Sequence, residues 1–199
     1  MTTPLGSPAD PITPARQSVS TVRAIFLVGF MGAGKTSVGK ILARRLGWVF
    51  EDLDHRIEAR EGRTVEQIFR ESGEADFRRI ETAALRELLE GLGSAHRVVA
   101  LGGGAFPQPE NAALLGPPDL ASVFLDGPVE ELFRRCHKQD VDRPLRGTLE
   151  GFQQLYQLRR PLYMKATVYV DTCGKDVEAV ANEVSRKVIG PQNDLRSGT

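Results

Sequence analysis

Short apolar runs alternate along the chain with longer segments in which apolar residues recur every three or four positions. The apolar runs lie near residues 24–28, 48–50, 97–101, 121–125 and 167–170, and they predict five strands. The longer segments predict helices near residues 34–46, 55–61, 65–71, 75–90, 129–136, 149–159 and 177–188. Strands that alternate with helices form parallel sheets with helices on both faces, so the pattern predicts an α/β domain of three layers, α/β/α.

The two ends of the chain lack this pattern. Residues 1–20 combine several prolines with Ser and Thr and predict a disordered leader, while residues 190–199 predict a flexible tail. The folded domain is therefore expected to span residues 21–189. Inside it, the polar segment 137–148 lies between two predicted helices, which is typical of a lid over a site and also of a plain surface loop.

The composition narrows the class of protein. Lys plus Arg and Asp plus Glu are equal at 26 each, so no net charge favours nucleic acid or an anionic membrane over a small ligand. No apolar run approaches the roughly 20 residues that span a bilayer, and the N-terminus lacks a signal-peptide pattern. The two cysteines show neither metal-ligand spacing nor a disulfide framework. These features predict a cytoplasmic protein that binds small molecules, without nucleic acid or membrane as a partner.

The segment 29–36 fits the pattern G-x-x-x-x-G-K-[ST] and lies between a predicted buried strand and a predicted helix. In such a loop the backbone N–H groups surround phosphates, Lys35 reaches the β and γ phosphates, and the Thr36 hydroxyl can bind Mg²⁺. The helix that follows directs the positive end of its dipole toward the same anion. The motif therefore predicts a nucleoside triphosphate site. Its predicted residues are Gly32, Ala33, Gly34, Lys35, Thr36 and Ser37.

Two carboxylates follow the second predicted strand in the sequence Asp52-Leu53-Asp54. In an extended backbone, residues two apart point to the same face, so both can project from the carboxyl end of the sheet, where open α/β folds bind ligands. Such a pair can divide its work, one acid serving Mg²⁺ and its waters and the other a substrate hydroxyl. A solvated turn in which Asp54 caps a helix is the alternative.

An arginine and a run of glycines are candidates for substrate binding. Arg78 and Glu81 share a face of a predicted helix, so the acid can fix the arginine as a fork for a carboxylate or phosphate. The run 102–104 ends the third predicted strand and lets a ligand touch the backbone, because no side chain intervenes. The alternative for Arg78 and Glu81 is a surface ion pair, and the alternative for the glycine run is a flexible connection.

Two more arginines are placed to meet anions. Arg143, on the predicted lid, could close over a transferred phosphoryl group, and Arg159, near a predicted helix end, could reach a second anion. Either could instead be a surface charge. No nucleophile–base or metal pattern is formed by Cys136, His55, His96 and His137.

Taken together, the motifs resemble those of the shikimate kinase family. In chain order they are G-F-M-G-A-G-K-T, D-L-D, G-E-A-D-F-R-x-x-E, L-G-G-G-A, D-R-P-L and R-x-P-L-Y. The resemblance runs from about residue 24 to about residue 189, which is nearly all of the foldable chain. It implies a P-loop fold of the nucleoside monophosphate kinase group, with a five-stranded parallel sheet, a substrate-binding helical region and a lid. It also implies ATP-dependent phosphorylation of the 3-hydroxyl of shikimate, a step toward chorismate and the aromatic amino acids.

The same resemblance implies how the phosphoryl group is handled. Asp54 would orient the 3-hydroxyl and help to deprotonate it. Thr36 would bind Mg²⁺ directly, and Asp52 would bind it through a water molecule. Lys35 and Arg143 would neutralise charge on the phosphoryl group, so the expected catalytic residues are Asp54, Lys35 and Arg143.

For shikimate itself, the resemblance implies that Arg78 and Arg159 bind the carboxylate, with Glu81 holding Arg78. The remaining expected contacts are Gly102, Gly103 and Gly104. The expected cofactor is Mg²⁺, the expected partners are shikimate and ATP, and the expected state is a monomer.

Adenine binding and the acceptor are the less determined features. The family uses an arginine near the start of the lid, here Arg134 or Arg135, together with residues 172–176; Arg135 is favoured. Another small-molecule kinase of this fold, for gluconate or a nucleotide, is the nearest alternative. The other alternative is a non-catalytic nucleotide-binding regulator. The presence of every residue expected to take part in catalysis and binding argues against it.

Overall fold

The computed structural model describes residues 22–138 and 148–190. The predicted leader and nearly all of the predicted tail lie outside the described residues, and so does the predicted lid apart from its two ends. The strands are β1 (Ala24–Val28), β2 (Val49–Asp52), β3 (Arg97–Ala100), β4 (Leu120–Asp126) and β5 (Val168–Asp171). The helices are α1 (Lys35–Leu46), α2 (Leu53–Glu61), α3 (Val65–Glu90), α4 (Pro109–Leu114), α5 (Val129–Lys138), α6 (Leu149–Tyr163) and α7 (Val177–Ile189).

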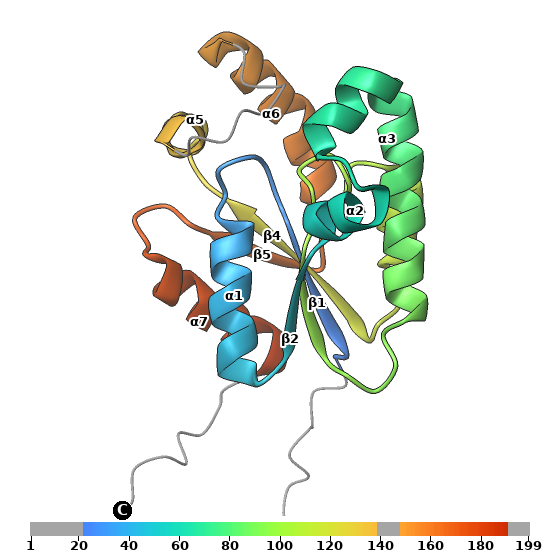
Figure 1. The fold of residues 1–199 in the computed structure, drawn as a ribbon. Coiled ribbons are helices and arrows are strands. Elements are labelled where there is room, and N and C mark those ends of the chain that lie inside the picture. The colour runs from blue at the N-terminus through green and yellow to red at the C-terminus, as the bar shows by residue number, and fades with distance from the viewer. Residues whose placement is uncertain (1–21, 139–147, 191–199) are drawn as a thin grey trace, which may run out of the picture.

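The five strands form one parallel sheet in the order β2-β3-β1-β4-β5. Helices α1 and α7 pack against each other on one side of this sheet, and α3 lies on the other side (Figure 1). The predicted three-layer α/β fold with a five-stranded parallel sheet is therefore confirmed. Because all strands run the same way, the loops after β1, β2 and β3 meet at one edge of the sheet.

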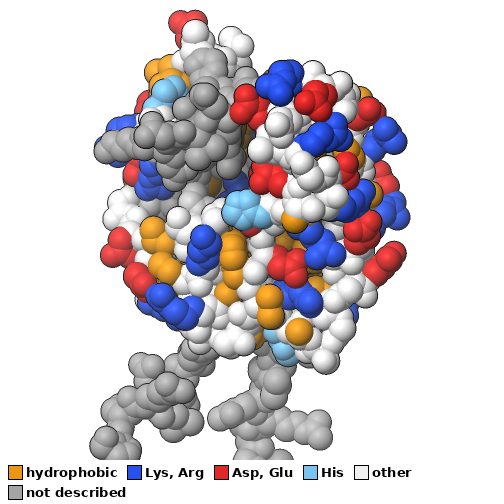
Figure 2. Space-filling model, viewed as in Figure 1, with side chains coloured by type: hydrophobic (Ala, Val, Ile, Leu, Met, Phe, Trp, Pro, Cys, Tyr) orange, Lys and Arg blue, Asp and Glu red, His pale blue; other side chains and the backbone are white. Residues whose placement is uncertain are grey.

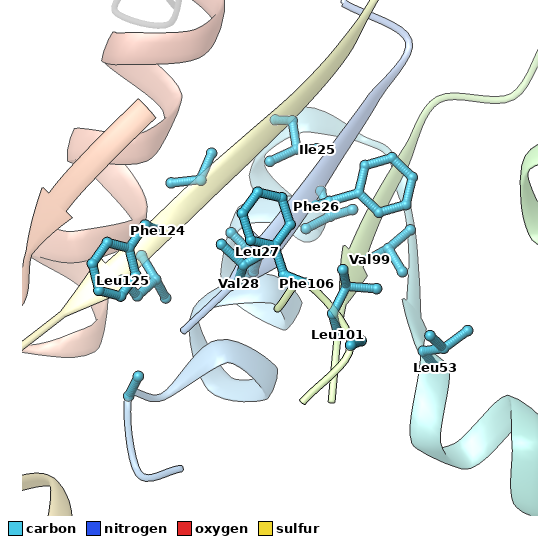
Figure 3. Close-up of a cluster of buried hydrophobic side chains, with 14 of the residues drawn as sticks. Ile25, Phe26, Leu27, Val28, Leu53, Val99, Leu101, Phe106, Phe124 and Leu125 are labelled. Atoms are coloured by element: carbon cyan, nitrogen blue, oxygen red, sulfur yellow. The ribbon is translucent and has the colours of Figure 1, made fainter. Parts of the chain in front are cut away.

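The core lies on both faces of the central strand. All five residues of β1 are buried, as are all seven of β4, which explains why these strands are continuous apolar runs and not alternating ones. Figure 3 shows Phe26 of β1 near Phe106 and Val99, with Leu53 at the start of α2. Packing of this kind fixes where the β1 and β3 loops leave the sheet.

Three helices differ in detail from the sequence prediction. Helix α3 covers both predicted helices 65–71 and 75–90, and its backbone breaks between them at Gly73, which has φ 80° and ψ 172°. Helix α6 continues past the predicted end at residue 159 to Tyr163 and contains Pro161. Helix α4 was not predicted, because six residues are too short to show a helical period.

A buried acid at the end of β4 anchors helix α6. The Oδ1 atom of Asp126 accepts a hydrogen bond from the Tyr156 hydroxyl at 2.6 Å, and Oδ2 accepts from Arg160 Nε at 3.0 Å. Asp126 is almost fully buried, so these bonds compensate the cost of burying its charge. The helix that carries Arg159 is thereby held to the sheet.

The surface shows mixed charge. Figure 2 shows basic and acidic side chains interspersed over the face in view, without a broad area of one sign. This arrangement agrees with the equal numbers of acidic and basic residues. Among the described residues, no helix combines the length and apolar character needed to cross a membrane.

Candidate active site

The loop after β1 has the backbone conformation of an anion-binding turn. Gly34 is the residue before α1 and has φ 84°, a left-handed conformation that favours glycine. Gly32 has φ 78°, and a Cβ there would overlap the carbonyl oxygen of Leu132 on α5. Lys35 Nζ donates hydrogen bonds to the carbonyl oxygens of Gly29 at 2.9 Å and Phe30 at 3.0 Å. The loop is thus folded around its own lysine, with the start of α1 facing the pocket.

Thr36 and the two acids after β2 lie together at the same edge. The Thr36 hydroxyl donates to Asp52 Oδ2 at 2.8 Å, and the Asp54 backbone N–H donates to Asp52 Oδ1 at 3.1 Å. Asp52 is extended at the end of β2, as assumed, but the same assumption is wrong for Asp54, which lies in the first turn of α2 with Asp52 as the cap of that helix. Capping still directs both carboxylates into one pocket, since it fixes the turn between them.

This pair of oxygens fits Mg²⁺. A threonine hydroxyl and a carboxylate are hard oxygen ligands, and Mg²⁺ in kinases is bound by one or two protein oxygens together with phosphates and waters. No group of three or more His, Cys, Asp or Glu residues in the described part of the chain could hold a metal. The donor set therefore suits an ion that arrives with the nucleotide.

The glycine run after β3 leaves room for the acids and arginine around it. A Cβ on Gly102 would lie 2.7 Å from Asp54 Oδ1 and 2.9 Å from Glu81 Oε1. A Cβ on Gly104 would lie 2.6 Å from Arg78 Nη1 and closer still to Nη2. The two glycines thus let the Asp54 carboxylate and the Arg78 guanidinium approach the same backbone segment.

The glycine run supports a prediction that separates two functions of the site. Gly102→Ala should displace the Asp54 carboxylate and mainly lower kcat, whereas Gly104→Ala should displace the Arg78 guanidinium and mainly raise KM for the acceptor. Each change is expected to exceed tenfold, or about 1.4 kcal/mol. Gly103→Ala meets nothing nearer than 3.7 Å and should be the mildest of the three. Steady-state kinetics of the three variants measure both constants. Equal effects of Gly102→Ala and Gly104→Ala on kcat and on KM would contradict this division.

Arg78 and Glu81 form the predicted pair on α3. Arg78 Nη1 donates to Glu81 Oε2 at 2.7 Å, and the Glu81 side chain is fully buried. Burial raises the pKa of the Glu81 carboxyl from 4.5 to about 7, and the neighbouring Arg78 only partly opposes this rise. Glu81 therefore holds the arginine in place near neutral pH while carrying only part of a negative charge.

The raised pKa of Glu81 predicts a pH dependence of stability. The folded state binds this proton more tightly than the unfolded chain, so its contribution to the free energy of unfolding is full below pH 4.5 and is lost as the pH rises to about 7. The loss should amount to about 3 kcal/mol. Urea unfolding of the wild type and of Glu81→Gln at pH 4 and pH 8 should show the stability of the variant, relative to the wild type, rising by that amount between the two pH values. A constant difference would mean that Glu81 titrates normally.

The structure brings most of the predicted residues together in one pocket. Of those predicted, the following line it: Gly32, Gly34, Lys35, Thr36, Ser37, Asp52, Asp54, Gly102 and Gly103. Ala33 is buried and does not line it, and neither do Gly104 and Arg78, which lie against each other. Arg159 lies close enough to Glu81 and Tyr163 to affect their pKa values.

For two predicted arginines, Arg135 and Arg143, the expected contacts remain predictions. Arg135 on α5 donates to Glu131 at 2.6 Å and is not among the pocket-lining residues, so an adenine contact remains a prediction. Arg143 lies outside the described residues, and its expected place over the phosphoryl group is likewise a prediction.

Five further residues line the pocket and were not predicted as site residues from the sequence. They are Met31, Leu101, Cys136, His137 and Phe152. Cys136 lies four residues after Leu132 on α5, and a Cβ on Gly32 would be 3.1 Å from its Sγ. That spacing of four, which puts both residues on the face toward the loop, was the one signal available. Tyr163 was also missed, although its hydroxyl donates to the Gly103 carbonyl oxygen.

A phosphate-binding loop, a pair of oxygens suited to Mg²⁺ and an arginine beside a glycine wall define a P-loop kinase that acts on a small acceptor. The family model described as "Shikimate kinase" matches residues 31–189. The chain belongs to the shikimate kinase family.

Individual relatives agree with this assignment. A shikimate kinase from Geobacter sulfurreducens is 43% identical over 166 residues, which cover 82% of this chain and 89% of the relative. The structure of shikimate kinase from Acinetobacter baumannii in complex with shikimate matches with a TM-score of 0.78 and 36% identity, covering 89% of this chain and 97% of that one. A gluconokinase from Sinorhizobium meliloti matches less well, with a TM-score of 0.56 and 26% identity over 83% of this chain and 93% of that one.

Proposed function

We propose that this protein is a shikimate kinase: it transfers the γ-phosphoryl group of ATP to the 3-hydroxyl of shikimate and so serves aromatic amino acid biosynthesis. The observation that carries the acceptor is the arrangement around residues 102–104. A carboxylate, Asp54, and a guanidinium, Arg78, approach this one glycine segment from two sides. Such a site suits a small acid that carries a hydroxyl group, because each end of the molecule meets its chemical complement.

In the proposed reaction, the 3-hydroxyl oxygen bonds to the γ-phosphorus while the bond from that phosphorus to the β,γ-bridging oxygen breaks. Asp54 accepts the hydroxyl proton and later returns it to water, and ADP leaves. Lys35 and Arg143 stabilise the charge on the transferred group. Mg²⁺, held by Thr36 and through water by Asp52, would neutralise charge on the β and γ phosphates.

Arg78 and Arg159 are proposed to bind the shikimate carboxylate. The support for Arg159 is its position on α6, close enough to Glu81 and Tyr163 to influence both groups. The protein is further proposed to act as a cytoplasmic monomer. Neither Cys136 nor Cys173 forms a disulfide, which agrees with a reducing compartment.

The test is ADP release with Mg·ATP in a coupled assay, with shikimate, quinate, gluconate and nucleoside monophosphates compared as acceptors. Stimulation by shikimate well above that by every other acceptor is expected. Equal or greater stimulation by gluconate would favour the gluconate-type kinase instead. Tight ATP binding without acceptor-dependent turnover would favour a regulatory protein.

The metal assignment gives a separate prediction. Asp52→Asn should raise the Mg²⁺ concentration needed for half-maximal activity about tenfold or more, because the carboxylate that would hold a water of the ion is lost. Asparagine can still cap α2, so the turn that places Asp54 should survive. A Mg²⁺ titration at fixed ATP measures the shift, and chelation of the metal should stop wild-type turnover. An unchanged Mg²⁺ requirement in the variant would remove Asp52 from the metal site.

A further inference from the structure

The guanidinium of Arg78 is bonded to two different acids. Its Nη1 donates to Glu81 Oε2 at 2.7 Å. Its opposite edge, formed by Nε and Nη2, donates twice to one oxygen of Glu74, at 3.3 and 3.0 Å. An edge with two parallel N–H groups is the part of an arginine that binds a carboxylate most strongly. Glu74 therefore holds the edge that suits an incoming carboxylate best.

The two acids differ sharply in their access to water. The Glu81 side chain is 0% exposed, whereas that of Glu74 is 59% exposed. A largely exposed carboxylate loses little when it leaves an ion pair for water, while a buried one would be left as an uncompensated charge. Glu81 thus suits a permanent anchor for Arg78, and Glu74 suits a bond that is exchanged.

The backbone around Glu74 supports this difference. Gly73, directly before it, interrupts α3 with φ 80° and ψ 172°. Glu74 is therefore the first residue after the break, at the N-terminal end of the helical segment that carries Arg78. A side chain at the first position of a helical segment can move without unwinding the residues that follow it.

The other neighbours of Arg78 are two aromatic rings and a glycine. Its Cζ lies 5.2 Å from the Phe77 ring centroid and 5.8 Å from that of Phe69. Gly104 lies against the same guanidinium. Of the groups that face it, only Glu81 and Glu74 are acids that bond to it among the described residues.

We propose that Glu74 is a displaceable counter-ion of Arg78, whose place at the Nε–Nη2 edge is taken by the carboxylate of the acceptor. This proposal rests on the proposed function. The exchange replaces one charge-assisted pair by another, so an acceptor with a carboxylate restores the lost bonds. A neutral acceptor cannot restore them, so it leaves Glu74 bonded to Arg78.

The test compares Glu74→Gln with a matched control, Asp76→Asn. Asp76 lies two residues further along α3 and pairs with Arg79 at 2.8 Å, so the control removes the same charge without touching Arg78. Calorimetry should show Glu74→Gln binding shikimate about two- to fivefold more tightly than the wild type, as expected for loss of a half-exposed competing ion pair. Asp76→Asn should bind as the wild type does.

A second readout uses the methyl ester of shikimate, which has no carboxylate. Glu74→Gln should not bind the ester more tightly, so the ratio of shikimate affinity to ester affinity should rise. A merely structural role of Glu74 would move both affinities together. The kcat and the KM for ATP should stay within about twofold of the wild type, as expected when only acceptor binding changes.

The outcomes are separable. Unchanged or weaker shikimate binding in Glu74→Gln would overturn the proposal, and so would equal tightening in Asp76→Asn, which would reveal a general charge effect. If the wild type shows no shikimate-dependent turnover, the proposed function fails and this proposal fails with it. Normal wild-type turnover without tighter binding in Glu74→Gln overturns this proposal alone.

Discussion

Asp54→Asn is expected to lose about 100- to 10,000-fold of shikimate-dependent turnover, the range for removal of a general base. Asp54 lines the pocket in the first turn of α2, and its backbone N–H is held by Asp52 at 3.1 Å. Asparagine has nearly the same shape, so the position of the side chain should persist while its ability to accept a proton is lost. ATP affinity should change little, because Lys35 and the loop after β1 are untouched.

The measurement is steady-state turnover together with calorimetric binding of ATP and shikimate. Asp76→Asn, the same substitution at an exposed position of α3, is the matched control and should keep wild-type turnover. Thermal unfolding of both variants checks that neither has lost its fold. Turnover of Asp54→Asn within about tenfold of the wild type would show that Asp54 only positions the acceptor.

Arg78→Met is expected to raise KM for shikimate by at least about 30-fold, since truncating one partner of a buried charged pair costs about 2–5 kcal/mol. Methionine keeps the apolar stem that packs near Phe77 but removes the guanidinium. The substitution also leaves the fully buried Glu81 without its cation, so stability should fall by about 3–5 kcal/mol if Glu81 is charged, and by less where it is protonated.

The double variant Arg78→Met/Glu81→Gln separates these two effects. It removes the buried charge along with its partner, so stability should recover while KM for shikimate stays high. Urea unfolding and steady-state kinetics of the single and double variants provide the comparison. Recovery of KM together with stability would mean that Arg78 supports the fold and does not bind the acceptor.

The features that the sequence predicted well are those set by local chain geometry. The loop after β1 needs glycines at fixed positions before a helix, and both the residues and their spacing are visible in the chain. The pairing of Arg78 with Glu81 follows from three-residue spacing on a helix. The order of strands and helices follows from apolar periodicity, so the fold class was predictable.

The features that were missed depend on residues brought together only by the fold. Asp126 bonds to Tyr156 and Arg160, which are 30 and 34 residues away, and no short pattern reveals such a cluster. His137 reaches the pocket because α5 ends beside the loop after β1. The placement of Asp54 was predicted from a backbone that stays extended beyond Asp52, but the chain turns into α2 at Leu53, and the cap at Asp52 fixes that turn.

The residues proposed to bind the acceptor are unevenly distributed along the chain. Asp54, Arg78 and the acids that hold Arg78 all belong to the continuous stretch from β2 to β3, while the loop after β1 is proposed to hold the nucleotide. The nucleotide and the acceptor would therefore be bound mainly by separate segments of the chain. A relative with the same sheet can change its acceptor through substitutions in this one segment of about 50 residues, because function depends on sites carried by a shared fold. Arg159, on α6, and the glycines 102–104, after β3, are the proposed exceptions and would have to coevolve with that interval.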